Sequence, residues 1–174
     1  MRRSVLACLV AAIVLSGIPA RAGAQDKPFS ALSRTLLAGR DSLVQLARGQ
    51  IGLRYRLGAV KPGLAFDCSG LVKWVLGVFD LHLPRTAAQQ AKLGLAIPRD
   101  TSRLLPGDLL LFGRGQRVTH IGIYVGDGKY VHAANRRKGV IESDITRAGP
   151  TWWKGARRLW LDSDSSGMTV RNQD

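Results

Sequence analysis

Three side chains of the sequence could together perform nucleophilic chemistry: Cys68, His120 and His132. A thiol attacks a carbonyl carbon once it has lost its proton, which an imidazole held by an orienting neighbour can accept. Cys68 lies in the segment AFDCSGLVKW, where Asp67 is a good N-cap for a helix. The dipole of that helix favours the thiolate by about 0.3–1 kcal/mol, which is less than one pKa unit. The helix alone therefore leaves the thiol protonated at neutral pH, and an imidazole must stand beside it.

The two histidines flank a glycine-rich turn in VTHIGIYVGDGKYVHAA, a segment that is typical of two paired strands. If the loop is the three residues 126–128, Val125 pairs with Lys129. His120 and His132 are then diagonal neighbours on one face, about 7–8 Å apart at the backbone. A two-residue Asp-Gly loop would put them on opposite faces. The catalytic interpretation therefore predicts the three-residue loop, with the first histidine as general base and the second as the orienting group.

The same residue types have other uses. His82, in the loop segment DLHLPR, is expected to be a surface or packing residue. A lone buried cysteine is often inert, and a hairpin histidine is often a packing residue. Cys68 and two histidines could also bind zinc, but the chain has no close-spaced ligand pair such as C-x-x-C or H-x-x-x-H. We therefore expect no metal and no cofactor at this site.

The first 24 residues have the features of a secretory signal peptide: two arginines, an apolar run over residues 5–18, and small residues up to Ala24. The apolar run is too short to span a bilayer, and no other run is long enough. We therefore expect cleavage near Ala24 and a periplasmic or secreted protein without a transmembrane segment. Cleavage would remove Cys8 and leave Cys68 as a lone cysteine, which cannot form an intramolecular disulfide.

The chain is strongly basic, with 26 Lys and Arg against 12 Asp and Glu and a net charge of +14. Loss of Arg2, Arg3 and Arg21 with the signal peptide would lower the net charge to +11. Such a charge suits a polyanion outside the cytoplasm, and it equally suits a solvated basic surface. The basic run at residues 136–138 has no nucleic-acid-binding motif around it, so no nucleic-acid partner is expected.

Hydrophobic spacing predicts the helices that would position these residues. Residues 33–50 and 68–79 have helical periodicity, and the second segment carries Leu71, Val72, Val75 and Leu76 on one face. Between them, residues 51–66 are rich in Gly and Pro and predict a loop. A further short helix is expected over residues 85–93, after a proline.

From residue 104 onward the pattern changes to strands: LLPGDLLLF, the histidine hairpin, GVIES and ARRLWL. Helices followed by an antiparallel sheet predict one α+β domain over residues 33–161. Residues 25–32 are expected to be a polar tether, and residues 162–174 a disordered tail.

Five segments resemble the NlpC/P60 family of cell-wall cysteine peptidases, in family order: FDCSGLVKWV, LPRTAAQQAKLG, LLPGDLLLF, THIGIYVGDGKYVHAA and ARRLW. The D-C-S-G block with a downstream H-x-G-I-Y and a further His-Ala is specific as a set. The resemblance implies a papain-like α+β fold, with N-terminal helices and a nucleophile at a helix N-terminus packed on a small antiparallel sheet. It also implies that Cys68 is the nucleophile, His120 the base and His132 the third, orienting residue.

The resemblance further implies a substrate, the amide bonds in peptidoglycan stem peptides or cross-links, hydrolysed through a thioester acyl-enzyme. Tyr55, Asp67 and Ser69 would line the site that holds the substrate's amine, although Asp67 is equally suited to a purely structural cap. Ser69 and Gly70 are expected to leave room for a substrate. The backbone N–H of Cys68 is the simplest donor to the oxyanion.

Two other functions stay open on the sequence. An amidase or acyltransferase could use the same Cys–His pair, and a non-catalytic wall-binding module could share the fold. The second would predict a lost nucleophile or base, and this chain keeps both. We expect a monomer whose partner is peptidoglycan.

Overall fold

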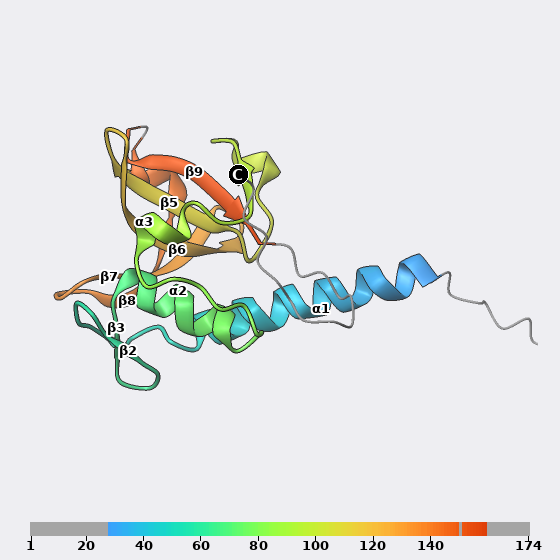
Figure 1. Cartoon of the computed structure of the whole chain (residues 1–174), viewed down its shortest axis with the longest axis horizontal. Helices are drawn as coiled ribbons and strands as arrows, with labels where there is room; N and C mark the ends of the chain where they lie inside the picture. Colours follow the sequence, from blue (N-terminus) through green and yellow to red (C-terminus); the bar gives the residue numbers. More distant parts are fainter. Residues whose placement is uncertain (1–27, 150, 160–174) are drawn as a thin grey trace, which may run out of the picture.

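A computed structural model of the chain describes residues 28–149 and 151–159 (Figure 1). The helices are α1 (Pro28–Arg48), α2 (Cys68–Gly77) and α3 (Ala87–Gln90), with 3₁₀ turns η1 (Thr101–Arg103) and η2 (Ile145–Ala148). The strands are β1 (Arg54–Tyr55), β2 (Val60–Lys61), β3 (Ala65–Phe66), β4 (Leu95–Ile97), β5 (Leu109–Arg114), β6 (Arg117–Gly126), β7 (Lys129–Asn135), β8 (Gly139–Asp144) and β9 (Trp153–Arg158). Within these residues, no helix combines the length and apolar character needed to cross a membrane.

The main sheet has six strands in the order β4-β9-β5-β6-β7-β8, and every neighbouring pair is antiparallel. Strands β1, β2 and β3 form a separate small sheet in the order β1-β3-β2. The sequence predicted only a loop over residues 51–66, and this prediction was wrong. Strands of two residues are too short to produce a periodic pattern, so spacing could not have revealed them.

The two faces of the main sheet pack against different parts of the molecule. One face joins the helices in the larger core, through Leu111, Ile121 and Val131 on the sheet and Leu71 and Val75 on α2. Figure 1 shows α1 and α2 together on this side of the sheet. The opposite face carries a smaller core with Leu110, Phe112, Tyr124, Tyr130 and Trp153. Side chains alternate along a strand, so both predicted catalytic histidines belong to the face with the smaller core.

Helix α2 begins where the sequence predicted, because the Asp67 side chain accepts a hydrogen bond from the Gly70 N–H at 2.8 Å. Helix α1 begins at Pro28, five residues before the predicted start. Proline has a suitable φ for the first turn of a helix, where its missing N–H costs no hydrogen bond. Residues 28–32 are therefore helix and not tether. Residues 25–27, the predicted signal peptide and the predicted tail lie outside the described residues.

Three other elements differ from the prediction. Helix α3 is only four residues long and starts after Thr86, whose side chain forms a capping box with Gln89. Strand β9 starts at Trp153 rather than Ala156, and β4 was not predicted at all. The α+β order of helices followed by an antiparallel sheet is confirmed.

Candidate active site

The β6–β7 turn reaches the predicted arrangement by a different route. Gly126, not Val125, pairs with Lys129 around the two-residue loop Asp127-Gly128. A bulge at Val125 then shifts the register, so that the pairs beyond it match those of a three-residue loop. A bulge adds one residue to one strand and so exchanges the faces beyond it. The predicted pairing of Val125 with Lys129 was wrong, but both histidines still share one face.

The two imidazoles are in direct contact. His120 Nε2 and His132 Nδ1 lie 2.6 Å apart and share a hydrogen bond, and the ring planes meet at 77°. The second nitrogen of His132, Nε2, lies 3.0 Å from the Ser143 hydroxyl on β8. The His120 ring packs beside Phe112 and Trp152, with ring centroids at 5.9 and 6.5 Å, and these two rings also contact each other. The aromatic rings fix the orientation of the His120 ring, and His132 occupies one of its two nitrogens.

Cys68 is the first residue of α2, which packs against β6 and β7. The β6–β7 ladder ends at the pair Ile123–Val131. Two residues from that pair, the backbone N–H of Ile121 on β6 lies close enough to the sulfur of Cys68 to lower the pKa of the thiol. This contact places the thiol against the residue that follows His120 in the chain. The structure therefore brings together the strand that carries the predicted base and the helix that carries the predicted nucleophile.

Burial sets the protonation of all three groups. It raises the pKa of the Cys68 thiol, and the charge of Asp67 adds to this, against the opposing effect of three backbone N–H groups. Burial lowers the pKa of His120 to about 4. It also lowers the pKa of His132 to about 3, with smaller contributions from His120 and Lys138. At neutral pH the site therefore holds a protonated thiol and two neutral imidazoles, and the helix N-terminus does not overcome burial.

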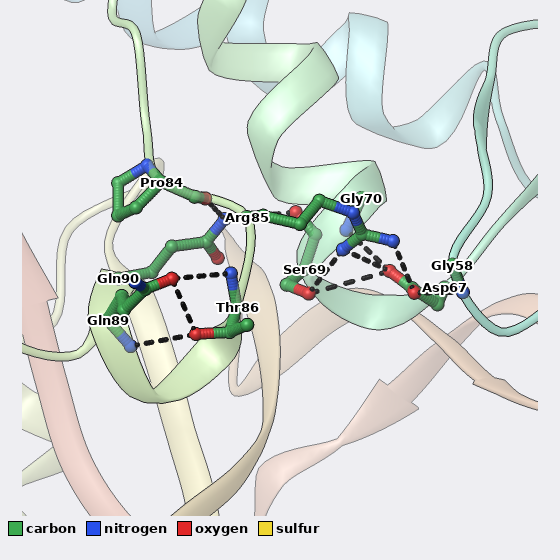
Figure 2. A network of polar contacts seen from close by, with 9 residues as sticks. All are labelled: Gly58, Asp67, Ser69, Gly70, Pro84, Arg85, Thr86, Gln89 and Gln90. Atoms are coloured by element: carbon green, nitrogen blue, oxygen red, sulfur yellow. Dashed lines mark hydrogen bonds and ion pairs between the residues drawn. The ribbon is translucent and has the colours of Figure 1, made fainter.

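Asp67, the residue before Cys68, lies in an ionic cluster that Figure 2 shows. Arg85 donates to both carboxylate oxygens, at 3.0 and 2.6 Å, and to the Ser69 hydroxyl at 3.0 Å. Backbone N–H groups of Gly58 and Gly70 donate to the same carboxylate. Burial alone would raise the pKa of Asp67, but these hydrogen bonds outweigh it and hold the pKa below its ordinary value. The carboxylate therefore has its counter-charge within the protein.

The other predicted substrate-binding residues also lie near Cys68 or Asp67. Tyr55 ends β1, and the charges of Cys68 and Asp67 contribute, after burial, to raising the pKa of its phenol. Ser69 is buried. The sequence predicted that Gly70 leaves room for a substrate, and this prediction was wrong. A Cβ at Gly70 would lie 2.2 Å from the Ala59 carbonyl oxygen, so the space is already filled by the chain. Its missing side chain accommodates the chain, not a ligand.

A cavity of about 790 Å³ opens on the histidine face of the main sheet. His120, His132, Ser143, Lys138 and Trp152 are among its lining residues, and Cys68 is not. The cavity therefore lies on the imidazole side of the thiol. Among residues 28–149 and 151–159, no three His, Cys, Asp or Glu side chains gather so as to hold a metal ion.

Two polar partners of the site were missed by sequence reasoning: Arg85 and Ser143. Arg85 lies 18 residues from its partner Asp67, and the segment PRT indicated only a helix start. Ser143 is on β8, directly opposite Tyr130 on β7. The alternation of the GVIES strand could have placed it on the histidine face, had the β7–β8 register been known.

A profile of the NlpC/P60 family matches residues 52–158, more than half of the chain. The chain belongs to the NlpC/P60 family. This NlpC/P60 protein is 36% identical over 157 residues to the probable endopeptidase NlpC of Escherichia coli (strain K12). The aligned region covers 87% of this chain and 96% of that relative. The family resemblance expected from the sequence is therefore confirmed.

Two other relatives match over shorter parts. Murein DD-endopeptidase MepS/Murein LD-carboxypeptidase of Escherichia coli (strain K12) is 42% identical over 105 residues, which cover 59% of this chain and 52% of MepS. The gamma-DL-glutamyl hydrolase of Bacillus subtilis (strain 168) is 35% identical over 136 residues, 74% of this chain and 32% of the relative. This NlpC/P60 chain therefore spans about half the length of MepS and a third of the Bacillus protein.

Among solved structures, that of NlpC1 from Trichomonas vaginalis aligns with a TM-score of 0.64 and 32% identity. The alignment covers 70% of this chain and 44% of that protein. The papain-like α+β fold expected for an NlpC/P60 member is confirmed by this likeness and by the arrangement of helices and sheet.

Proposed function

We propose that this NlpC/P60 chain is a cysteine endopeptidase that hydrolyses amide bonds in peptidoglycan stem peptides or cross-links. The observation that carries the proposal is the contact between His120 and His132, with Cys68 held against the same strand. A base with an orienting partner beside a thiol at a helix N-terminus is the arrangement that acyl transfer needs. The names of two relatives, a probable endopeptidase and a murein endopeptidase, support the reaction and the substrate class.

The first half of the reaction makes the acyl-enzyme. The Cys68 sulfur attacks the scissile carbonyl carbon while its proton passes to His120 Nδ1, the nitrogen that His132 leaves unoccupied. The backbone N–H of Cys68 stabilises the oxyanion. The C–N bond then breaks, and His120 gives its proton to the leaving amine, which yields a thioester.

The second half returns the enzyme to its resting state. His120 takes a proton from a water molecule, whose oxygen attacks the thioester carbonyl. The C–S bond breaks, the acid product leaves, and the proton returns to the sulfur of Cys68. Since both imidazoles start neutral, His120 can accept a proton in each half of the cycle.

For the substrate's amine we propose the side of Cys68 that carries Tyr55, Asp67 and Ser69. Asp67 is already paired with Arg85 in this structure, so its contact with an amine requires Arg85 to turn away. Until then the carboxylate caps α2. We also propose that the protein acts in the periplasm or outside the cell, after cleavage near Ala24. N-terminal sequencing of the exported protein tests that site.

Mass spectrometry of purified peptidoglycan fragments, incubated with the protein or with Cys68→Ala, tests the function. Cleavage by the wild type alone would support the hydrolase and identify the bond. A γ-glutamyl polymer is the second substrate to include, because the Bacillus relative is named a gamma-DL-glutamyl hydrolase. A transferred acyl group on an added amine would identify an acyltransferase. Binding to wall material without any reaction would favour a non-catalytic module.

A further inference from the structure

A chain of hydrogen bonds runs from the predicted base across three strands. His120 Nε2 meets His132 Nδ1 at 2.6 Å, and His132 Nε2 meets the Ser143 hydroxyl at 3.0 Å. The Ser143 hydroxyl also hydrogen-bonds to the phenol of Tyr130. A neutral imidazole has one N–H and one acceptor nitrogen, so every link in this chain has a direction.

The sulfur decides the direction at one end. The nearby backbone N–H groups of Ile121, Ser69 and Cys68 favour the thiolate over the thiol, so the proton of the thiol is what needs an acceptor. On His120 the only nitrogen free to accept it is Nδ1, since Nε2 is bonded to His132. His120 must therefore carry its own proton on Nε2 and donate it to Nδ1 of His132.

At the other end of this row of hydrogen bonds, Ser143 must then accept a hydrogen bond. If His132 Nδ1 accepts, its Nε2 carries the N–H, and the partner of Nε2 is the Ser143 oxygen. Ser143 can accept there because a hydroxyl oxygen has two acceptor lone pairs, while its own proton can turn to the neighbouring Tyr130 oxygen. Burial raises the pKa of Tyr130, so the phenol stays neutral. The reverse direction would put a proton on His120 Nδ1, where it would block the thiol.

We propose that Ser143 is a positioning residue that holds His132 in the Nε2–H form and so keeps His120 Nδ1 free as the base. The same direction is required after proton transfer, when His120 carries both protons and needs an acceptor at His132 Nδ1. This inference rests on the proposed function, because it assigns a purpose to the base. It concerns the protonation of two rings, which can be measured without any substrate.

The test compares wild type, Ser143→Ala and Ser143→Thr by ¹⁵N NMR of the imidazole nitrogens at neutral pH. We expect His132 Nε2–H in wild type and Ser143→Thr, and a shift toward Nδ1–H in Ser143→Ala. With His132 in the Nδ1–H form, the protonated His120 loses its acceptor, and loss of a hydrogen bond to a charged group corresponds to about 10- to 100-fold. In Ser143→Ala the rate at which iodoacetamide alkylates Cys68 should fall by that factor. The kcat on peptidoglycan fragments should fall by the same factor, with KM unchanged. Threonine should restore both.

The matched control is Ser42→Ala, which removes an exposed hydroxyl that bonds only to the Ala38 carbonyl of its own helix. It should leave the ring protonation and the alkylation rate as in wild type. If Ser143→Ala does not fold, Tyr130→Phe keeps the buried ring and removes the acceptor of the Ser143 proton. The freed hydroxyl would then donate to His132 and drive its proton to Nδ1.

An unchanged His132 Nε2–H form with an unchanged alkylation rate, in Ser143→Ala or in the substitute variant, would overturn the inference. A shifted ring proton with slower alkylation supports it, whatever the enzyme cleaves. If wild type cleaves no peptidoglycan, the proposed function fails, and the NMR and alkylation results still decide the role of Ser143.

Discussion

Two polar clusters lie near Cys68, and they differ in charge: one is neutral and the other is ionic. The histidine relay, made of His120, His132 and Ser143, is neutral, because burial lowers the pKa of both imidazoles. The Asp67 clamp, made of Asp67, Arg85 and Ser69, is ionic, because the guanidinium offsets the burial of the carboxylate. The relay is held by aromatic rings and single hydrogen bonds, whereas the clamp is held by a bidentate ion pair.

The difference separates a cluster that can change charge from one that cannot. A neutral imidazole accepts a proton when the thiol releases one, and its lowered pKa makes that charged state short-lived. A carboxylate with donors on both oxygens has no such freedom, and it fixes the start of α2 and hence the position of the sulfur. We therefore expect changes in the relay to appear mainly in rates, and changes in the clamp mainly in stability.

The largest expected effect is kinetic. His120→Ala removes the proposed base and should lower the rate of peptidoglycan cleavage by about 10²–10⁴-fold, the usual contribution of general acid–base catalysis. The matched control is His82→Ala, because His82 is exposed and bonds only to the backbone of its own loop. Initial rates on the same fragments compare the two. Equal rates for wild type and His120→Ala would remove the relay from the mechanism.

The second effect is the dependence of stability on pH. Both relay imidazoles have folded pKa values, about 4 and about 3, that lie below the ordinary value of 6.5. Between those values and 6.5 the unfolded chain binds more protons than the folded one. The free energy of unfolding should therefore fall as the pH drops below about 6.5, by at most about 1.4 kcal/mol per pH unit for each imidazole. Above pH 6.5 these groups should give no slope.

Urea unfolding at several pH values measures that slope. His132→Asn should reduce it, and His82→Ala should leave the contribution of the relay unchanged. The clamp gives a slope of the same sign in a more acidic range, since its lowered carboxylate pKa gives stability that is lost only below the ordinary pKa of Asp67. A slope between pH 4 and 6.5 that survives His132→Asn in full would show that His132 titrates normally.

The third comparison grades three ion pairs by burial. Side-chain exposures are 15% and 0% for Arg158–Asp108, 37% and 6% for Arg85–Asp67, and 37% and 29% for Arg48–Glu142. Arg158→Met leaves a fully buried carboxylate and should destabilise by about 3–5 kcal/mol. Arg85→Met should cost about 1–3 kcal/mol, because water reaches its side of the pair, and Arg48→Met about 0–1 kcal/mol.

Urea unfolding at neutral pH ranks the three variants. Arg85 and Arg48 have equal exposure, so the difference between them reflects the burial of the carboxylate and the two further hydrogen bonds of Arg85. The same loss for both would mean that the Asp67 clamp is no more than a surface ion pair.

Local pattern predicted the parts of the site that depend on short-range physics. The Asp67 cap, the apolar face of α2 and the shared face of the two histidines all follow from spacing within a single element or hairpin. The face assignment was right although the loop was wrong, because the bulge at Val125 restored the register. Gly126, with a φ of 97°, is the residue whose chemistry could have indicated that bulge.

The partners that complete each cluster could not be predicted, because they come from distant segments. Arg85 reaches Asp67 only when the chain after α2 turns back along it. Ser143 reaches His132 only through the β7–β8 register. Nothing in PRT or in VIES distinguishes these side chains from solvated ones. Their roles depend on tertiary packing, which spacing does not encode.

The smallest expected effect probes the packing under the relay. At Gly122 a Cβ would lie 2.8 Å from Tyr130 Cδ2 and 3.1 Å from His132 Cβ, so Gly122→Ala must displace the Tyr130 ring and should move His132 by a few tenths of an ångström. Overpacking of this kind costs about 1–3 kcal/mol of stability. A displaced orienting group should also lower the cleavage rate by about tenfold, since a 1 Å misplacement can cost a hundredfold.

The control is Gly77→Ala at the end of α2, where a Cβ would meet nothing within 4 Å. It should stabilise the protein by at most about 1 kcal/mol, as alanine does in a helix, and leave the rate unchanged. Unfolding curves and initial rates on both variants separate packing from proton transfer. If Gly122→Ala lost stability but kept its full rate and its Cys68 alkylation, the relay would tolerate displacement. The cleavage rate would then not depend on the exact position of His132. The relay and the Asp67 clamp would differ only in charge, and not in how precisely their side chains must be held.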